Sequence, residues 1–378
     1  MKTEVNKMTK QPSYRFAGYT ESWVEKKLGE VADRYDNLRV PVSANERISG
    51  STPYYGANGI QDYVDGYTHD GEFILIAEDG ASDLKDYPVQ YVNGKVWVNN
   101  HAHVIRGKHN LIKNLFLLFA VKRINIEPFL VGGGRAKLNS DVMMKLPLRL
   151  PSLSEQTAIG SFFQDIDQLI SLQQRKLEVL KEQKKTYLKL LFPAKGQTKP
   201  ALRFAGFEDD WKEVKLGEVT DIKTGGRDVQ NSVEDGLYPF YIRSEEVKRI
   251  NSYSFDGEAI LIPGEGRLGE IFHYANGKFD VHQRVYKISN FTDVNAKFVL
   301  QQMKKDFKQH AMRNTVKATV DSLRLPTIQS FNILVPSLPE QTAIGSFFQD
   351  LDKAIAKQEE KVNQLKESKQ TFLKEMFI

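Results

Sequence analysis

The sequence predicts an α+β protein with two globular domains and two long antiparallel coiled-coil helices, arranged as an internal repeat with pseudo-two-fold symmetry. Three observations support this prediction. The string EQTAIGSFFQD occurs at Glu155–Asp165 and again at Glu340–Asp350. A heptad-like apolar pattern follows each copy, as in a coiled coil. The segments that precede the two copies are largely dissimilar, and both contain short β-branched runs and one amphipathic stretch.

Length and composition restrict the class of protein. A chain of 378 residues, 40% apolar and 27% charged, is a globular protein of two or three domains. It has no cysteine, which excludes disulfides, a thiol nucleophile and a Cys-ligated zinc site. The N-terminus lacks the apolar region of a secretory signal, and the longest apolar run, LFLLFAV, cannot span a bilayer. We therefore expect a cytoplasmic protein with no membrane contact, and its net charge of +5 favours an anionic partner.

The repeat defines the expected domain boundaries. Residues 151–192 align without a gap with residues 336–377 and match at roughly 26 of 42 positions. The openings Arg15–Val31 and Arg203–Val219 also match. We expect a leader over 1–14, a first globule over 15–150, a first spacer helix over 151–192, a linker over 193–202, a second globule over 203–335 and a second spacer helix over 336–378.

Each repeated segment is expected to form one long helix. Pro151 precedes it, Ser154 is the expected N-cap and Glu155 favours the first turn. Apolar residues then recur at alternating steps of three and four, with Gln and Lys at the remaining seam positions. The predicted helix–helix seam is Phe163, Ile166, Ile170, Leu177, Leu180 and Tyr187, with Gln173 and Lys184, in the first helix, and Phe348, Leu351, Ile355, Val362, Leu365 and Phe372, with Gln358 and Lys369, in the second.

Paired helices of this length suggest a spacer on DNA. About 36 helical residues at 1.5 Å each make a rod of roughly 54 Å. Such an apolar seam must be buried, and we expect the two helices to pack on each other, as two subunits would in a dimer. A two-fold protein reads DNA half-sites about 34–36 Å apart. Because the two globules differ, we expect a non-palindromic site with two unrelated halves and an unread gap.

The globules have a coarse α+β pattern. Phe73–Ala77 and Val96–Val98 are expected strands, and one amphipathic helix is expected in each globule, at about 111–123 and 294–312. The segment FPAKGQTKPAL, with two prolines and a glycine, ends the first long helix.

Beyond these patterns, the chain resembles the specificity subunit of Type I restriction–modification systems over nearly its whole length. The doubled LPSLSEQTAI and VPSLPEQTAI blocks, the doubled RFAG…W…KLGEV opening, and the strings YYGANGIQDYV and VNNHAHVI carry the resemblance. It implies two target-recognition domains for a bipartite site, and two conserved helices that space them and dock methyltransferase subunits. It further implies two methyltransferase (M) and two restriction (R) subunits as partners. S-adenosylmethionine is then bound by the M subunit, ATP and Mg belong to the full enzyme, and none of these binds this chain.

The residues agree with a non-catalytic subunit. An (N/D/S)PP(Y/F) loop of adenine methyltransferases, a G-x-x-x-x-G-K-[ST] phosphate loop and a G-x-S-x-G elbow are all missing from the sequence. The glycine clusters VGGGR and PGEGRLG lack the strand–loop–helix spacing of a nucleotide fingerprint and are expected turns.

Candidate DNA contacts are chosen by chemistry, because Arg, Lys, Asn and Gln read base edges or bind phosphates. They lie in short polar loops; for each residue alone, a solvated surface position is the alternative. For His101 and His103 a structural hydrogen bond or base contact is favoured over a metal site, because no acidic ligand is near in sequence. Asn58 is favoured as a contact, and Tyr63 and Tyr67 as structural residues. The candidates are Arg34, Arg39, Asn58, Asn99, Asn100, His101, His103, Arg135, Lys137, Asn139, Arg227, Arg243, Lys248, Arg267, His282, Gln283, Arg284, Arg313 and Lys317.

Two other classes stay open on sequence grounds. A stand-alone bipartite DNA-binding protein, such as a repressor, needs only one spacer and not two near-identical helices. A coiled-coil scaffold that never touches DNA is disfavoured by the basic charge and the variable polar loops. Leu169, Leu172, Val179, Leu188 and Leu190 lie off the seam of the first helix, where they either dock a partner or pack on the adjoining globule.

Overall fold

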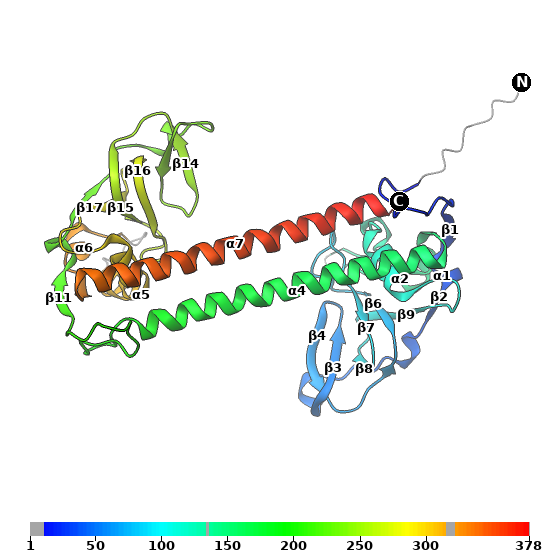
Figure 1. The fold of residues 1–378 in the computed structure, drawn as a ribbon. Helices are drawn as coiled ribbons and strands as arrows, with labels where there is room; N and C mark the ends of the chain where they lie inside the picture. Colours follow the sequence, from blue (N-terminus) through cyan, green and yellow to red (C-terminus); the bar gives the residue numbers. More distant parts are fainter. Residues whose placement is uncertain (1–10, 134–135, 315–321, 378) are drawn as a thin grey trace, which may run out of the picture. The chain divides into compact units, whose positions relative to one another are not determined.

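The computed structural model describes residues 11–133, 136–314 and 322–377 (Figure 1). The chain divides into two compact units. Unit 1 consists of Met1–Gln174 and Lys361–Ile378, and unit 2 consists of Arg175–Glu360. Each unit therefore contains the beginning of one long helix and the end of the other, α4 (Leu153–Leu190) and α7 (Leu338–Met376).

Unit 1 is built on two four-stranded sheets, of order β2-β9-β6-β7 and β4-β3-β8-β5. Strand β6 is buried at every position, because it lies between β7 and β9 and is covered by helix α2. A short antiparallel pair, β1 with β10, forms a separate two-stranded sheet. The elements are β1 (Val24–Lys27), α1 (Leu28–Val31), β2 (Ala32–Arg34), η1 (Asp36–Leu38), η2 (Ala44–Glu46), β3 (Ser49–Gly56), β4 (Gly59–Val64), β5 (His69–Asp70), β6 (Phe73–Ala77), β7 (Val89–Val92), β8 (Lys95–Val98), β9 (Ala102–Gly107), α2 (Asn114–Arg123), η3 (Glu127–Phe129), α3 (Ser140–Met143) and β10 (Pro147–Leu150).

Unit 2 has a six-stranded sheet of order β12-β17-β15-β16-β13-β14 and a two-stranded sheet of β11 with β18. Helix α5 packs on β15 in this unit, as α2 packs on β6 in unit 1. The elements are β11 (Lys212–Lys215), η4 (Leu216–Glu218), β12 (Asp221–Thr224), η5 (Val229–Asn231), β13 (Tyr238–Tyr241), β14 (Val247–Ile250), β15 (Phe255–Pro263), β16 (His273–Val281), β17 (Val285–Ser289), α5 (Ala296–Asn314), α6 (Leu325–Gln329) and β18 (Asn332–Val335).

The glutamate of each EQTAIG string is explained by a buried ion pair. Glu155 accepts hydrogen bonds from Arg15 Nε and Nη2 at 2.6 and 2.7 Å. Glu340 accepts from Arg203 Nε and Nη2, both at 2.7 Å. Both glutamates are 1% exposed. Because each arginine belongs to an RFAG opening, the pair joins the first residues of each globule to its long helix, and the two repeated strings depend on each other.

The glutamine of the string connects the long helix to the loop before the globule's own helix. Gln156 Oε1 accepts from the backbone N–H of Lys113 at 2.9 Å, just before α2. Gln341 Oε1 accepts from the backbone N–H of Asn295 at 2.8 Å, just before α5. Both glutamines are 1% exposed, so each is a buried polar side chain whose oxygen is paired with a backbone N–H group.

The glycine of the string permits close helix packing. A Cβ at Gly160 would lie 2.9 Å from Leu115 Cβ and 3.0 Å from the Phe116 backbone nitrogen in α2. A Cβ at Gly345 would lie 3.0 Å from the Phe298 backbone nitrogen in α5. Any larger residue would push the two helices apart.

The far end of each long helix carries a phenylalanine that completes an aromatic cluster. Phe377, after α7, packs in unit 1, and Phe192, after α4, packs in unit 2. Their ring centroids lie 5.4 to 6.2 Å from those of Trp23, Phe116 and Phe163 for Phe377, and 5.3 to 6.1 Å from those of Trp211, Phe298 and Phe348 for Phe192.

Within each unit the two long helices run antiparallel. In unit 1 the Phe162 and Phe372 rings lie 5.2 Å apart. In unit 2 the Tyr187 and Phe347 rings lie 5.1 Å apart, and Lys181 Nζ lies 2.5 Å from Glu359 Oε1. Every one of the twelve predicted apolar seam residues is buried or half-buried.

Local predictions were correct for most elements. Strand β6 covers the expected Phe73–Ala77, and α2 and α5 begin three and two residues after the expected starts. The expected N-cap Ser154 is wrong: α4 begins at Leu153, and the Ser152 hydroxyl accepts the backbone N–H of Glu155 at 3.4 Å. In the described part of the chain, every helix is too short or too polar to cross a membrane.

Candidate nucleic-acid interface

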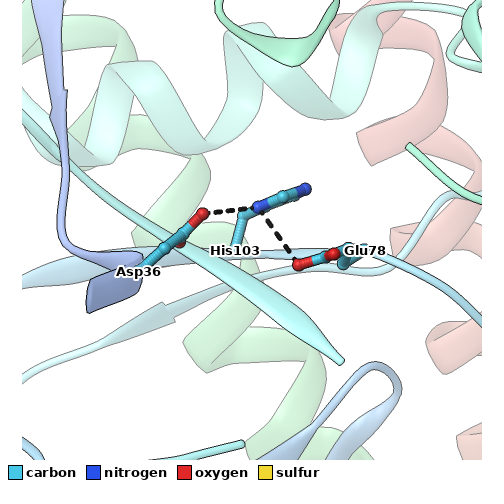
Figure 2. A group of neighbouring side chains, drawn as sticks. All are labelled: Asp36, Glu78 and His103. Carbon is cyan, nitrogen blue, oxygen red and sulfur yellow. Dashed lines mark hydrogen bonds and ion pairs between the residues drawn. The ribbon is translucent and has the colours of Figure 1, made fainter. Parts of the chain in front are cut away.

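A buried histidine joins two carboxylates in unit 1 (Figure 2). His103, at the second position of β9, is 1% exposed. Its Nδ1 lies 2.8 Å from Asp36 Oδ2 and 3.5 Å from Glu78 Oε2, and its Nε2 lies 2.8 Å from the Leu138 carbonyl oxygen. The histidine thus connects β9 to η1, to the loop after β6 and to the loop that precedes α3.

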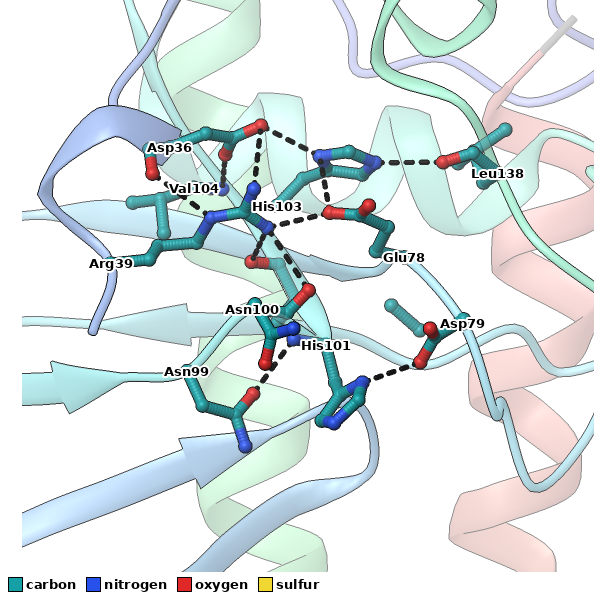
Figure 3. Close-up of polar contacts among 12 residues, drawn as sticks. Asp36, Arg39, Glu78, Asp79, Asn99, Asn100, His101, His103, Val104 and Leu138 are labelled. Atoms are coloured by element: carbon teal, nitrogen blue, oxygen red, sulfur yellow. Dashed lines mark hydrogen bonds and ion pairs between the residues drawn. The ribbon is translucent and has the colours of Figure 1, made fainter. Parts of the chain in front are cut away.

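Two cations, Arg39 and Lys137, pair with these carboxylates, and Figure 3 shows the contacts of Arg39. Arg39 Nη1 lies 2.6 Å from Glu78 Oε2 and donates to the Ala102 carbonyl at 2.8 Å, and its Nη2 lies 3.6 Å from Asp36 Oδ2. Lys137 Nζ lies 2.8 Å from Glu78 Oε1. Each carboxylate of the cluster is therefore paired with at least one cation.

The network lowers the pKa values of its carboxyl groups. Burial alone would raise the pKa of Asp36, but hydrogen bonds from His103 and from the Val104 N–H outweigh it and hold the pKa below its usual value. Burial likewise opposes ionisation of Glu78, and the bonds from Lys137 and Arg39 lower its pKa. Both groups are therefore held as carboxylates.

Three side chains of this cluster carry atoms that bind metal ions in other proteins. The ligand atoms of Asp36, Glu78 and His103 lie within 4.8 Å of one another. The two acids are far from His103 in sequence, Asp36 in η1 and Glu78 after β6, and the fold brings them to the histidine. However, Arg39 and Lys137 already pair with the carboxylates, so a metal ion would have to displace them. The chemistry of the cluster therefore fits a structural network better than a metal site.

A turn between β8 and β9 lies beside this network (Figure 3). The Asn99 side chain is 4% exposed and its Oδ1 accepts the backbone N–H of His101 at 2.8 Å. His101 Nδ1 lies 2.6 Å from Asp79 Oδ1. Asn100, between them, is exposed. The turn thus presents Asn100 and the half-buried His101 from a rigid base.

Asn58 joins two neighbouring loops of unit 1. Its Nδ2 donates to the Gly80 carbonyl at 2.9 Å, and its Oδ1 accepts the Ser82 N–H at 2.8 Å. The side chain is therefore engaged within the protein, although the residue is exposed. Tyr63 and Tyr67, expected to be structural, are 53% and 49% exposed.

In unit 2, candidate residues from three separate segments meet. The backbones of Arg227 and His282 form an isolated parallel β-bridge, and the Arg227 Nε lies 3.2 Å from Asp280 Oδ2. Glu265 accepts from Arg243 Nη1 at 3.2 Å and pairs with Arg284. Asp280 is 0% exposed, so a buried carboxylate orients Arg227 here as Glu78 orients Arg39 in unit 1.

A hollow of about 680 Å³ lies next to this group. Ile242 and Ile271 contribute apolar surface, and Arg243, Arg267 and His282 line it as well. Burial, with a contribution from nearby Arg243, lowers the pKa of His282, which favours a neutral ring. Glu245, Glu246 and Glu265 also line the hollow, and Arg243 and Arg267 pair with Glu265 and Glu245, so the hollow combines ion-paired arginines with a neutral hydrogen-bonding ring.

A second ion-pair group lies beside the hollow. Arg267 bonds to Glu270 and Glu245, at 2.9 Å in each case. Bonds from Lys308 and Arg267 lower the pKa of Glu270 to about 2.

The predicted contacts fall into three groups by exposure. Asn99, His103 and His282 are 4%, 1% and 4% exposed, so they support loops and do not offer a surface to DNA. Arg135 and Lys317 lie outside the described residues. Arg39, His101 and Lys248 are half-buried, and the exposed candidates are Arg34, Asn58, Asn100, Lys137, Asn139, Arg227, Arg243, Arg267, Gln283, Arg284 and Arg313.

Sequence reasoning missed the acidic residues that position these cations. Asp36, Glu78, Asp280 and Glu265 each pair with a predicted arginine. A search for DNA-binding chemistry selects only cations and amides. The available signal was that Asp36, Glu265 and Asp280 lie within or beside a segment that supplies a predicted contact; Glu78, directly after the strand Phe73–Ala77, gave no such signal.

Comparison with known proteins identifies the family. A model of the Type I restriction modification DNA specificity domain matches residues 20–182 and 208–367. The chain belongs to this family. It is a non-catalytic specificity subunit, which confirms the resemblance noted in the sequence.

Relatives and solved structures agree. A Haemophilus influenzae protein described as a type I restriction enzyme specificity subunit is 34% identical over 87% of this chain and 86% of its own. The specificity subunit of an Escherichia coli type I restriction enzyme is 34% identical over 40% of this chain and 32% of its own. The crystal structure of an M. genitalium S subunit superposes with a TM-score of 0.75 at 15% identity, covering 98% of this chain and 99% of that one. The α+β fold with two domains and long helices is thereby confirmed.

Proposed function

We propose that unit 1 and unit 2 each read one half of a bipartite, non-palindromic DNA site. The observation that carries this proposal is the convergence of candidate loops in each unit. Arg39, Lys137 and the turn at Asn100 meet around Glu78 and His103, and Arg227, Arg243 and Arg284 meet around Asp280 and Glu265. Preorganised cations and amides on rigid loops are what groove readout requires.

The long helices are proposed to set the spacing between the two half-sites. Helix α4 has 38 residues and α7 has 39, and each contributes to both units. Because each helical residue adds about 1.5 Å, a change in helix length would alter the distance between the two base-reading surfaces. The non-identical readers then require two unrelated half-sites with a gap between them.

The helices are also proposed to dock two copies of a methyltransferase subunit. Leu169, Leu172 and Val179 lie off the seam of α4 and are 39%, 63% and 49% exposed. Docking would bury this apolar surface. Two similar helices suit two copies of one partner, and two restriction subunits would join through them. On this proposal S-adenosylmethionine binds the methyltransferase subunit, and ATP and Mg are used by the partner subunits of the full enzyme. The complex works in the cytoplasm, where its DNA lies.

Co-purification tests the partner proposal. The chain, expressed with its methyltransferase, should form a complex with one copy of this chain and two of the partner. Purified alone, it should neither methylate nor cut DNA. A complex of another ratio would contradict the docking model, and a chain that bound a bipartite site with no partner would favour a stand-alone DNA-binding protein.

Domain exchange tests the reading proposal. Replacing Arg15–Leu150 with the globule of a related subunit should change one half of the methylated motif and leave the other half intact, as read by methylation-sensitive sequencing. A change in both halves would contradict independent reading.

A further inference from the structure

The two globules contain structurally equivalent turns, residues 99–101 and 282–284, whose sequences differ. In unit 1 the turn joins β8 to β9, and in unit 2 it joins β16 to β17. Strand β8 pairs in parallel with β3, as β16 pairs with β13. The first turn residue donates its backbone N–H across this pair: Asn99 to the Tyr55 carbonyl at 3.1 Å, and His282 to the Tyr241 carbonyl at 3.0 Å. Asn99 and His282 are therefore equivalent positions.

The first residue of each turn holds the third residue in the same way. Asn99 Oδ1 accepts the N–H of His101 at 2.8 Å, and His282 Nδ1 accepts the N–H of Arg284 at 3.0 Å. Both accepting side chains are 4% exposed. The lowered pKa of His282 agrees with this role, because only an unprotonated Nδ1 can accept. Two chemically different residues thus perform one task.

The third residue of each turn pairs with an equivalent carboxylate. His101 Nδ1 lies 2.6 Å from Asp79, and Arg284 pairs with Glu265. The strings GEFILIAED, ending at Asp79, and GEAILIPGE, ending at Glu265, align without a gap. Their strands pair with the strand after the turn in matching register, Ala77 with Ala102 and Pro263 with Val285.

A further bond behind the turn is also shared. His103 Nε2 lies 2.8 Å from the Leu138 carbonyl, and the Tyr286 hydroxyl donates to the Leu323 carbonyl at 3.1 Å. Leu138 and Leu323 in turn donate their N–H groups to Glu78 and Gly264 at 2.7 and 2.8 Å. The scaffold behind each turn is therefore the same, while the residues that face outward differ.

We infer that these turns are equivalent base-reading elements, in which Asn99 and His282 are positioning residues and the pairs Asn100–His101 and Gln283–Arg284 determine specificity. This inference rests on the proposed function. Asn and Gln match adenine in the major groove, and Arg matches guanine. Asn100 and Gln283 are exposed, and Arg284 has 54% of its side chain exposed. The carboxylates restrain the side chain of the third turn residue. Less conformational entropy is therefore lost when that side chain binds a base.

Exchange of the outward pair tests specificity. The variant Gln283→Asn/Arg284→His, which installs the unit 1 pair in unit 2, is assembled with the methyltransferase and its motif is read by methylation-sensitive sequencing. We expect altered bases in one half only, with affinity for the original duplex reduced by about tenfold or more. Lys212→Gln removes one positive charge, as the exchange does, but from the separate β11–β18 sheet, and should leave the motif unchanged. An unaltered motif in the exchange variant overturns the inference.

Substitution of the positioning residue supplies the second measurement. His282→Asn should retain the motif, because asparagine performs this role at position 99, whereas His282→Leu should lose recognition of the same half. Equal behaviour of the two variants overturns the positioning role. Failure of the proposed function would look different from failure of this inference. The wild-type complex itself would then methylate a motif without two separated halves.

Discussion

Lys369 Nζ lies 2.5 Å from Asp167 Oδ1 in unit 1, and the same pair recurs in unit 2, where Lys184 Nζ lies 2.5 Å from Asp352 Oδ1. Both aspartates end the repeated QDID and QDLD strings, and both lysines occupy polar seam positions. Each pair joins α4 to α7. The interval from Asp167 to Lys184 in α4 equals the interval from Asp352 to Lys369 in α7, so equal lengths of helix connect the two pairs.

We expect these pairs to favour one register of the antiparallel helices, as polar seam residues do in coiled coils. Lys369→Asp places two carboxylates together and should destabilise unit 1 by about 1–2 kcal/mol, above the range of an exposed pair because the lysine side chain is only 15% exposed. The double variant Asp167→Lys/Lys369→Asp should recover most of the loss in chemical unfolding. Equal stability of the single and double variants would contradict the pairing.

The terminal phenylalanines give a matched test of how the units are completed. Phe377→Ala should destabilise unit 1 by about 3–5 kcal/mol, because a buried ring leaves a cavity among Trp23, Phe116 and Phe163. Phe192→Ala should have the corresponding effect on unit 2. Hydrogen exchange followed by mass spectrometry reads both units in one sample. Faster exchange at α2 in the Phe192 variant, or at α5 in the Phe377 variant, would contradict the assignment.

The fold was predictable where a pattern is local or repeated. The heptad pattern led to both long helices, and the apolar run Phe73–Ala77 led to a buried strand. The Ser154 cap was wrong because Ser152, two residues earlier, also satisfies the cap chemistry, and one sequence does not choose between them. Such errors move a boundary by one or two residues and leave the element in place.

The geometry of the candidate interface was not predictable, because sheet pairing creates it. His103 meets Asp36 only because β2 and β9 are neighbours, and it meets Glu78 because β6 and β9 are neighbours. No local periodicity records a contact between segments so far apart in the chain. The equivalence of Asn99 with His282 was hidden for a related reason: their shared task is to accept a hydrogen bond, which an amide oxygen and an imidazole nitrogen do equally well.

Acid should weaken unit 1 through Asp36 and Glu78. Their folded pKa values lie below the ordinary values of 3.8 and 4.5. A carboxyl group with a lowered folded pKa contributes stability that is fully present above its unfolded pKa and is lost as pH falls through the folded value. The contribution of these two groups to the stability of unit 1 should therefore be constant above about pH 5. It should decrease as the pH falls below about 4. Chemical unfolding across pH 3–7 measures this dependence.

The variant Asp36→Asn isolates one contribution to that pH dependence. Asparagine keeps a hydrogen-bonding oxygen but has no titrating group, so the variant should be less stable at pH 7 and show a shallower loss on acidification. Asp70→Asn, at an exposed position of unit 1 outside the network, is the matched control and should leave the acid slope unchanged. An unchanged acid slope in Asp36→Asn would show that the network does not hold this carboxylate.

Shortening the long helices tests the spacing role directly. Deleting four residues within Gln173–Lys181 shortens α4 by about 6 Å and rotates its remaining part by about 40°, since four residues exceed one turn of 3.6. The gap between the two methylated half-sites should then change, as measured by methylation-sensitive sequencing. Because equal lengths of α4 and α7 join the Asp–Lys pairs, a matching deletion of four residues within Gln358–Lys366 should recover stability lost in the single deletion while keeping the altered gap. A gap that stays the same in both variants, in complexes that still methylate DNA, would rule out the helices as the determinant of spacing.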